Sequence, residues 1–246
     1  MKKLTLVVIG VCALVGFAYA ASELSSDNKT YSWRYKMTVE VETPEGIVTG
    51  SAVRQMGNEA KGVDLPDVGN PADVSGEAVV VDLGKRGVLF VLISHKSDLE
   101  FYYTFRKYFP HGGSTLEGSK FYASMPTGTK EVFDPEKPPG YPKLVTFTDM
   151  NDPKSVTLVQ VWERQRSGLF SLKEDRFEEL FGEGVKLKGI TLEITDEPVT
   201  WGVVDKYLSW LKDLKGGCLH GGFTARGAPL GLYGGNFQRD LDKWEK

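Results

Sequence analysis

The segment at residues 31–43, YSWRYKMTVEVET, constrains the fold of this chain more than any other stretch. Large apolar side chains occupy every second position, and the positions between them are polar or charged. Successive side chains of a β-strand point to opposite faces, so this alternation predicts a strand with one buried and one solvated face. Residues 44–46 then predict a turn, and residues 47–53 predict the returning strand of a hairpin. Such a hairpin is typical of an antiparallel sheet whose outer face meets water.

Two more hairpins follow along the chain. Residues 77–83 and 88–93 are almost continuous in valine, leucine and isoleucine, and the turn GKRG separates them. Such runs indicate strands that are covered on both faces. Residues 144–148 and 156–162 predict a third hairpin across the turn sequence DMNDPK.

A further strand is predicted at residues 185–194, and helices are few. A capping-box pattern at residues 97–100 opens an aromatic helix that ends before Pro110. Residues 175–181 predict a short helix, because their phenylalanine and leucine residues recur at helical spacing. The longest helix is predicted at residues 198–214, where two neighbouring apolar stripes are followed by a glycine pair.

Hairpins followed by helices predict an α+β fold, in which two or three helices pack on a mostly antiparallel sheet of hairpins. We expect residues 21–246 to form a single domain, because that length supports one large core. Residues 58–75 and 112–141 are rich in Gly, Pro, Asp and Ser and predict long surface loops. Loops of this length often carry function, so a ligand site is sought there first.

Residues 1–20 have the pattern of a secretory signal peptide. Two lysines precede an uncharged apolar stretch, and Ala18-Tyr19-Ala20 matches the small-residue pattern at which signal peptidase cleaves. The apolar stretch is shorter than the roughly 20 residues of a membrane span, and no later segment of that length lacks charges. The sequence therefore predicts cleavage after Ala20, export to the periplasm, and a mature chain without a transmembrane span.

The charge and cysteine content of the mature chain narrow its partners. Cleavage after Ala20 removes two of the 30 basic residues and none of the 33 acidic ones, which leaves a net charge of −5. Because phosphate-backbone binding depends on clustered lysine and arginine, nucleic acid is not an expected partner. Cleavage also removes Cys12 and leaves Cys218 alone, so no intramolecular disulfide is expected.

The string GGCLHGGF at residues 216–223 is the segment that most resembles a reactive centre. Cys218 and His220 stand two residues apart, but glycines on both sides preorganise them poorly, so we predict a loop here. His95 and His111 are far from His220 in the sequence and lack metal-site spacing.

The remaining reactive motifs are no more specific. Residues 149–152, DMND, resemble the start of a calcium loop, but its later glycine and glutamate are missing, so a turn with Asx hydrogen bonds is predicted. The chain has neither a G-x-S-x-G elbow nor a phosphate-binding glycine loop. The sequence therefore predicts no catalytic residue, no metal site and no cofactor.

Aromatic side chains are the remaining candidates for a site. They crowd residues 101–109 beyond what one helix face can bury, and more follow after a glycine-rich loop. One interpretation is that the rings cover the open face of the sheet, and the other is a binding surface, which tyrosine suits because its ring brings large contact area. The predicted binding residues are Phe101, Tyr102, Tyr103, Phe105, Tyr108 and Tyr122.

Four strings carry a resemblance to a family: WRYKMTVEVETPEGIVTGSAV, GEAVVVDLGKRGVLFVLIS, LFGEGVKLKGITLEITDEPVTWG and GGNFQR. They resemble a family of uncharacterised bacterial exported envelope proteins, and together they extend over most of the mature chain. The resemblance implies an export or lipoprotein signal at the start of the chain. It implies no activity, cofactor or site residue.

Three functions are compatible with these observations. The first is a non-enzymatic exported domain that binds an envelope protein or another envelope component through the aromatic segment and adjoining loops. The second is a periplasmic hydrolase whose carboxylate pair is assembled only in three dimensions. The third is a periplasmic inhibitor or immunity protein.

Overall fold

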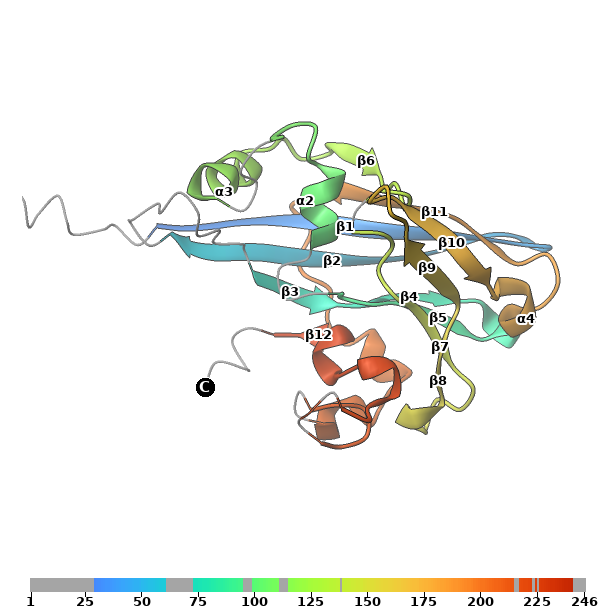
Figure 1. The fold of residues 1–246 in the computed structure, drawn as a ribbon. Coiled ribbons are helices and arrows are strands. Elements are labelled where there is room, and N and C mark those ends of the chain that lie inside the picture. The colour runs from blue at the N-terminus through green and yellow to red at the C-terminus, as the bar shows by residue number, and fades with distance from the viewer. Residues whose placement is uncertain are drawn as a thin grey trace, which may run out of the picture.

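The structure is a computed structural model of the chain (Figure 1). Antiparallel sheets dominate it and helical pieces are few, which agrees with the predicted α+β class. The sheets are more extensive than separate hairpins, because strands from distant parts of the chain pair within one sheet. The structure describes residues 29–60, 73–94, 99–110, 115–137, 139–214, 217–222, 224 and 226–240.

The largest sheet has six strands, with the long hairpin of β1 (Lys29–Thr43) and β2 (Gly46–Ala60) at its centre. Thr43 pairs with Gly46 at the turn, and the pairing continues to Lys29 and Ala60, which confirms the first predicted hairpin. Every second residue of β1 from Trp33 to Val41 is buried, as the alternation predicted. The order is β12-β3-β2-β1-β11-β6, with β3 (Asp73–Glu77), β6 (Lys130–Val132), β11 (Lys186–Ile194) and β12 (Gln238–Arg239).

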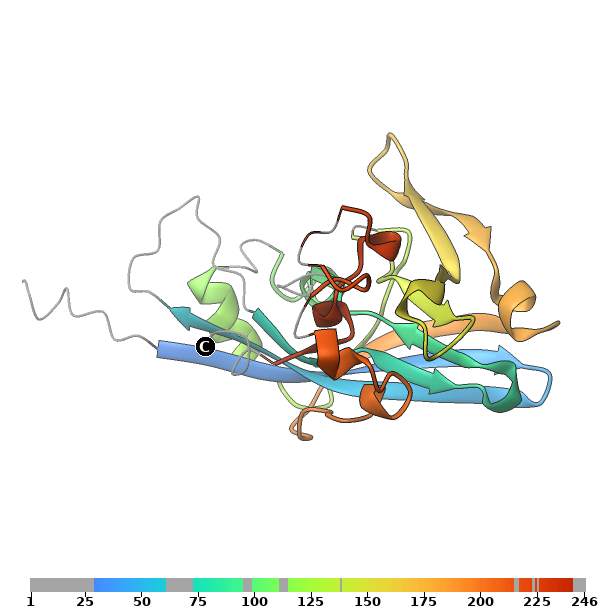
Figure 2. The same cartoon turned by 90° about the horizontal axis from the view of Figure 1, so that it is seen from below.

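A second sheet has four strands in the order β4-β5-β7-β8. It confirms the second predicted hairpin and the first part of the third. The predicted strand at residues 156–162 is split, because after β8 the chain enters β9, which pairs with β10 in a separate ribbon that rises from the large sheet (Figure 2). The bounds are β4 (Val79–Asp82), β5 (Val88–Val91), β7 (Leu144–Phe147), β8 (Val156–Leu158), β9 (Gln160–Arg164) and β10 (Phe170–Asp175).

The four-stranded sheet is covered on both faces, which explains its continuous apolar sequence. Val79 and Leu89 belong to the core that this sheet shares with the large sheet. Their neighbours Val80 and Phe90 point the other way and pack with Leu208 and other residues of the C-terminal segment in a second core. The molecule thus has three layers, with β4 and β5 in the middle one.

The three described α-helices are short. They are α2 (Leu99–Thr104), α3 (Leu116–Ala123) and α4 (Phe177–Phe181). The helix α4 confirms the prediction at residues 175–181, and α2 lies inside the predicted aromatic helix, whose cap Ser97 is outside the described residues. The rings of α2 and α3 pack on β1, with the Trp33 centroid 5.6 Å from those of Phe101 and Tyr122. In the described part of the chain, no helix is long and apolar enough to cross a membrane.

The helix predicted at residues 198–214 is wrong. This segment contains only two short 3₁₀ turns, Val204–Lys206 and Leu211–Leu214. Gly202 has a left-handed φ of 77°, and the buried carboxylate of Glu77 accepts the N–H groups that an incipient helix would leave unpaired. The apolar pattern therefore identified buried side chains correctly but not the backbone conformation.

Arg54, a fully buried residue of β2, links three strands. Its Nε donates to the carbonyl oxygen of Glu77 at 3.0 Å, and its Nη2 donates to that of Val91 at 3.2 Å. Burial lowers the pKa of Arg54 to about 10, against the opposing effect of the Glu100 charge, so the guanidinium stays protonated at neutral pH. These bonds fix β2 against β3 and β5 at the junction of the two sheets.

Candidate functional site

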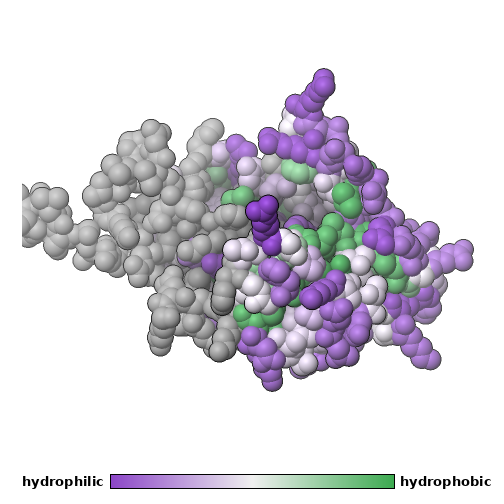
Figure 3. Space-filling view, turned by 60° about the horizontal axis from the view of Figure 1, so that its bottom comes forward, coloured by the Kyte–Doolittle hydropathy of each residue, from purple (hydrophilic) through white to green (hydrophobic). Residues whose placement is uncertain are grey.

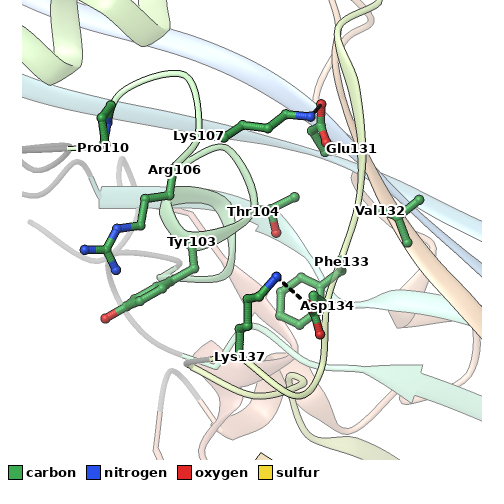
Figure 4. Close-up of a pocket in the computed structure, with 10 residues that line it drawn as sticks. All are labelled: Tyr103, Thr104, Arg106, Lys107, Pro110, Glu131, Val132, Phe133, Asp134 and Lys137. Carbon is green, nitrogen blue, oxygen red and sulfur yellow. Dashed lines mark ion pairs between the residues drawn. The ribbon is translucent and has the colours of Figure 1, made fainter. Parts of the chain in front are cut away.

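A cavity of about 450 Å³ lies between α2 and β6 (Figure 4). Its volume is within the range of roughly 300 to 1,000 Å³ that small-molecule sites occupy. The outward side of α2 and the turn after it form one wall, with Tyr103 and Arg106. The other wall is β6 and the residues that follow it, with Val132 and Lys137. We call this space the α2–β6 cavity and take it as the candidate site.

The spacing of residues along α2 decides which side chains reach the cavity. Phe101 and Phe105 are four residues apart, lie on one helix side, and are completely buried in the core. Tyr103 and Arg106 lie on the opposite side and are exposed. The core contacts of the buried rings therefore hold the outward residues against the cavity.

The structure divides the six predicted binding residues into two groups. Tyr103 and Tyr108 are 39% and 40% exposed, and Tyr103 lines the cavity. The other four are at most 8% exposed, so their side chains offer a partner little surface. They cover the inner face of the large sheet, which was the alternative interpretation of the aromatic cluster. These four core residues are Phe101, Tyr102, Phe105 and Tyr122.

Glu131 of β6 joins the two walls of the cavity. Its Oε1 accepts the hydroxyl of Tyr108 at 2.6 Å and lies 2.7 Å from Nζ of Lys107. Burial by itself would raise the pKa of Glu131, but the hydrogen bonds from Lys107 and Tyr108 outweigh it and lower that pKa. The hydrogen bond to Glu131 raises the pKa of Lys107, so both groups are charged at neutral pH.

A second ion pair lies within the turn after β6. Nζ of Lys137 lies 2.7 Å from the carboxylate of Asp134, and this contact lowers the pKa of Asp134 (Figure 4). Arg106 differs from the two lysines of the cavity, because among the described residues no carboxylate lies within ion-pair distance of it. Its guanidinium carbon lies 5.8 Å from the centroid of the Tyr103 ring.

Sequence reasoning missed five cavity residues on the β6 wall. They lie in the segment predicted as a long loop at residues 112–141, where the structure instead has the three-residue strand β6. A strand this short carries little periodic signal, and only its pairing with β11 defines it. The loop had been singled out for a ligand search, and that general expectation was the available signal. The missed residues of this wall are Glu131, Val132, Phe133, Asp134 and Lys137.

The structure confirms the predicted loop around Cys218 and His220. The Cys218 N–H donates to the carbonyl of Gly222 at 2.7 Å, and the Gly221 N–H returns to the carbonyl of Cys218 at 2.8 Å. Cys218 is buried and forms an isolated bridge with Tyr233, whereas His220 is exposed. The segment is a tight turn, and its glycines serve the turn.

The predicted Asx turn at residues 149–152 is also confirmed. Oδ1 of Asp149 accepts the N–H of Asn151, and Oδ1 of Asp152 accepts that of Lys154, both at 2.9 Å. These carboxylates lie in an exposed turn and do not line the α2–β6 cavity. Over the described ranges, no three His, Cys, Asp or Glu side chains converge as metal ligands. His95 and His111 lie outside those ranges.

The buried hydroxyl of Tyr122 leads to a stability prediction. It has no hydrogen-bond partner among the described residues, and burial raises the pKa of Tyr122 to about 12. An unsatisfied buried polar group costs stability, so Tyr122→Phe should raise the free energy of unfolding by about 1 kcal/mol, measured by urea denaturation. Tyr108→Phe is the control, because it removes a hydroxyl that is bonded to Glu131 and should bring no gain. A loss of stability in Tyr122→Phe would contradict the prediction.

The surface drawn in Figure 3 shows apolar side chains interrupted by hydrophilic ones. A face of this kind does not by itself mark a large apolar interface. Comparisons of the chain with protein-family models, with curated proteins and with solved structures find no match. The case for a function therefore rests on the cavity.

Proposed function

We propose that the protein is an exported binding domain of the bacterial cell envelope, and that its ligand occupies the α2–β6 cavity. The leader sequence and the resemblance to envelope proteins support the compartment. The observation that carries the proposal is the cavity itself: about 450 Å³, walled by the exposed ring of Tyr103 and by charged side chains. Its walls are held by core packing and ion pairs, as in a preformed ligand site.

The groups that line the cavity favour binding over carboxylate-based hydrolysis. A general acid at neutral pH needs a raised carboxyl pKa. Glu131 and Asp134 both have lowered pKa values, because lysines pair with them. Their arrangement instead stabilises the two walls of the cavity.

A capture experiment tests the proposed function. The mature chain is immobilised and exposed to a bacterial envelope extract, and bound proteins and small molecules are quantified by mass spectrometry. We expect a specific component that binds the wild-type chain and is lost with Thr104→Lys, because the Thr104 side chain points from α2 towards β6 and a lysine there would fill the cavity (Figure 4). Tyr103→Ala should weaken the same capture.

Trp201→Ala is the matched control for this experiment. Trp201 is 42% exposed, close to the 39% of Tyr103, but it does not line the cavity. Equal capture by wild type, Thr104→Lys and Tyr103→Ala would refute the cavity as the binding site. The same preparation checks export, since the purified chain should begin at Ala21, and an intact Met1 would contradict cleavage.

A further inference from the structure

We infer that the ligand of the α2–β6 cavity presents a single carboxylate beside an apolar group, and that Arg106 binds the carboxylate. The inference rests on the proposed function and names the chemistry of its ligand. It follows from the charges, the exposed surfaces and the shape of the lining side chains.

Among the described residues, the charges of the cavity leave one cation, Arg106, without a carboxylate. Of the described residues that line it, three are basic and two are acidic. Lys107 lies 2.7 Å from Glu131, and Lys137 lies 2.7 Å from Asp134, so both carboxylates are occupied by lysines. The lowered pKa values of these acids and the raised ones of the lysines keep both pairs ionised at neutral pH. Arg106 therefore supplies one net positive charge, which suits a monoanion.

The setting of Arg106 favours a carboxylate over other anions. Its guanidinium carbon is 5.8 Å from the Tyr103 centroid, so the ring supports the cation from one side. A guanidinium presents a planar fork of donors that matches the two oxygens of a carboxylate. A phosphate group carries more negative charge, and the second charge would find both lysines already paired.

Apolar surface next to Arg106 defines the rest of the ligand. Tyr103 is 39% exposed on α2, and its ring lies on the same side of the helix as Arg106 (Figure 4). Pro110 is exposed and also lines the cavity. Burying these surfaces requires an apolar body attached to the acid, because the gain is about 25 cal/mol for each Å² of apolar surface removed from water.

A matched pair of probes tests the inference. Phenylpropionate and phenylpropionamide have nearly the same shape, but only the first carries a charge. We expect the acid to bind the mature chain at least about tenfold more tightly than the amide in NMR titrations at low ionic strength, because hydrogen bonds between charged groups are stronger than neutral ones. Arg106→Gln should reduce acid binding to the level of the amide.

Arg226→Gln provides the control for charge. It removes the same charge from an exposed position in the C-terminal segment, which packs on the far face of the four-stranded sheet, and should leave both affinities unchanged. Tyr103→Ala should weaken both probes, because it removes apolar contact, and should weaken the acid more, because it also removes the ring that supports Arg106. Tyr103→Phe keeps the ring and should bind both probes as tightly as the wild type does.

The outcomes separate the ligand class from the proposed function. Equal binding of acid and amide, or acid binding that survives Arg106→Gln, would overturn the carboxylate inference while leaving a binding cavity. If neither probe binds but Thr104→Lys still abolishes capture from the extract, the ligand class alone would be overturned. If neither probe binds and the variant captures as much from the extract as the wild type does, both the ligand class and the proposed function would be overturned. Acetyl-alanyl-phenylalanine and its amide form a second pair of probes. Tighter binding of this peptide acid than of phenylpropionate would identify a peptide terminus as the source of the carboxylate. Tighter binding of phenylpropionate would identify a free organic acid.

Discussion

Replacing Gly50 with alanine is expected to lower the free energy of unfolding by about 3 kcal/mol or more. Gly50 lies in the middle of β2, paired with Val39 of β1. A Cβ atom at this position would lie 2.1 Å from the carbonyl oxygen of Val80 and 2.9 Å from Cγ2 of Val81. Both contacts are far below van der Waals distance, and the nearer one involves backbone.

The three-layer packing prevents β4 from moving away from an added methyl group. Val81 is buried in the core shared with the large sheet, and Val80 is buried in the second core with the C-terminal segment. Shifting β4 would therefore disturb both cores, and close-packed interiors transmit such strain. Gly50 permits the close approach of the two sheets through its missing side chain.

Gly57→Ala is the control for this prediction. Gly57 lies on the same strand, and an added Cβ would meet its nearest neighbour, Cβ of Ser32, at an ordinary 3.5 Å. We expect a change of about 0.5 kcal/mol or less for Gly57→Ala, measured with Gly50→Ala by urea denaturation at constant m-value. Similar losses for the two variants would show that the layers are not packed as the structure describes.

The second large effect is expected for Glu77→Gln, which should destabilise the protein by about 3 kcal/mol. Glu77 is completely buried. Its carboxylate accepts N–H groups from Gly202 at 2.6 Å, Val203 at 2.9 Å and Val204 at 3.3 Å, and Nε2 of Gln238 at 2.8 Å. A glutamine would turn an NH₂ group towards these donors and leave some of them unpaired.

The location of Glu77 predicts where the damage appears. Its bonds attach residues 202–204 to the end of β3, and this attachment replaces the start of the helix that the sequence predicted. Glu77→Gln should therefore speed amide hydrogen exchange in residues 200–214 more than in β1. Glu197→Gln is the control, because Glu197 forms an exposed pair with Lys36 at 2.8 Å and should cost about 0.5 kcal/mol or less. Equal effects of the two variants would contradict the buried role of Glu77.

Strands were predictable where burial alone imposed a period. The alternation in β1 and the continuous apolar runs of β4 and β5 describe one-sided and two-sided burial, and the structure has both. The prediction of a helix at residues 198–214 was wrong, although it used the same kind of periodicity as the correct strand predictions. Periodicity reports which side chains are buried, whereas the backbone there is set by Glu77, a residue more than a hundred positions away.

The candidate site was only partly predictable. The aromatic segment was located correctly, and Tyr103 reaches the cavity, but four of the six rings are in the core. Composition cannot decide which rings of a short helix face inwards when nearly every position is aromatic. The opposite wall, with Glu131 and Val132, depends on β6 pairing with β11, and that contact joins segments far apart in the chain.

The sequence by itself determined the antiparallel hairpins, the positions of their turns and the burial of the apolar stripes, because these follow from interactions between near neighbours and water. Only the tertiary structure decided the close approach at Gly50, the buried bonds of Arg54 and Glu77, and the α2–β6 cavity. Each of these depends on groups that meet across different layers or sheet edges. Such contacts exist only after the chain has folded, so no local pattern encodes them.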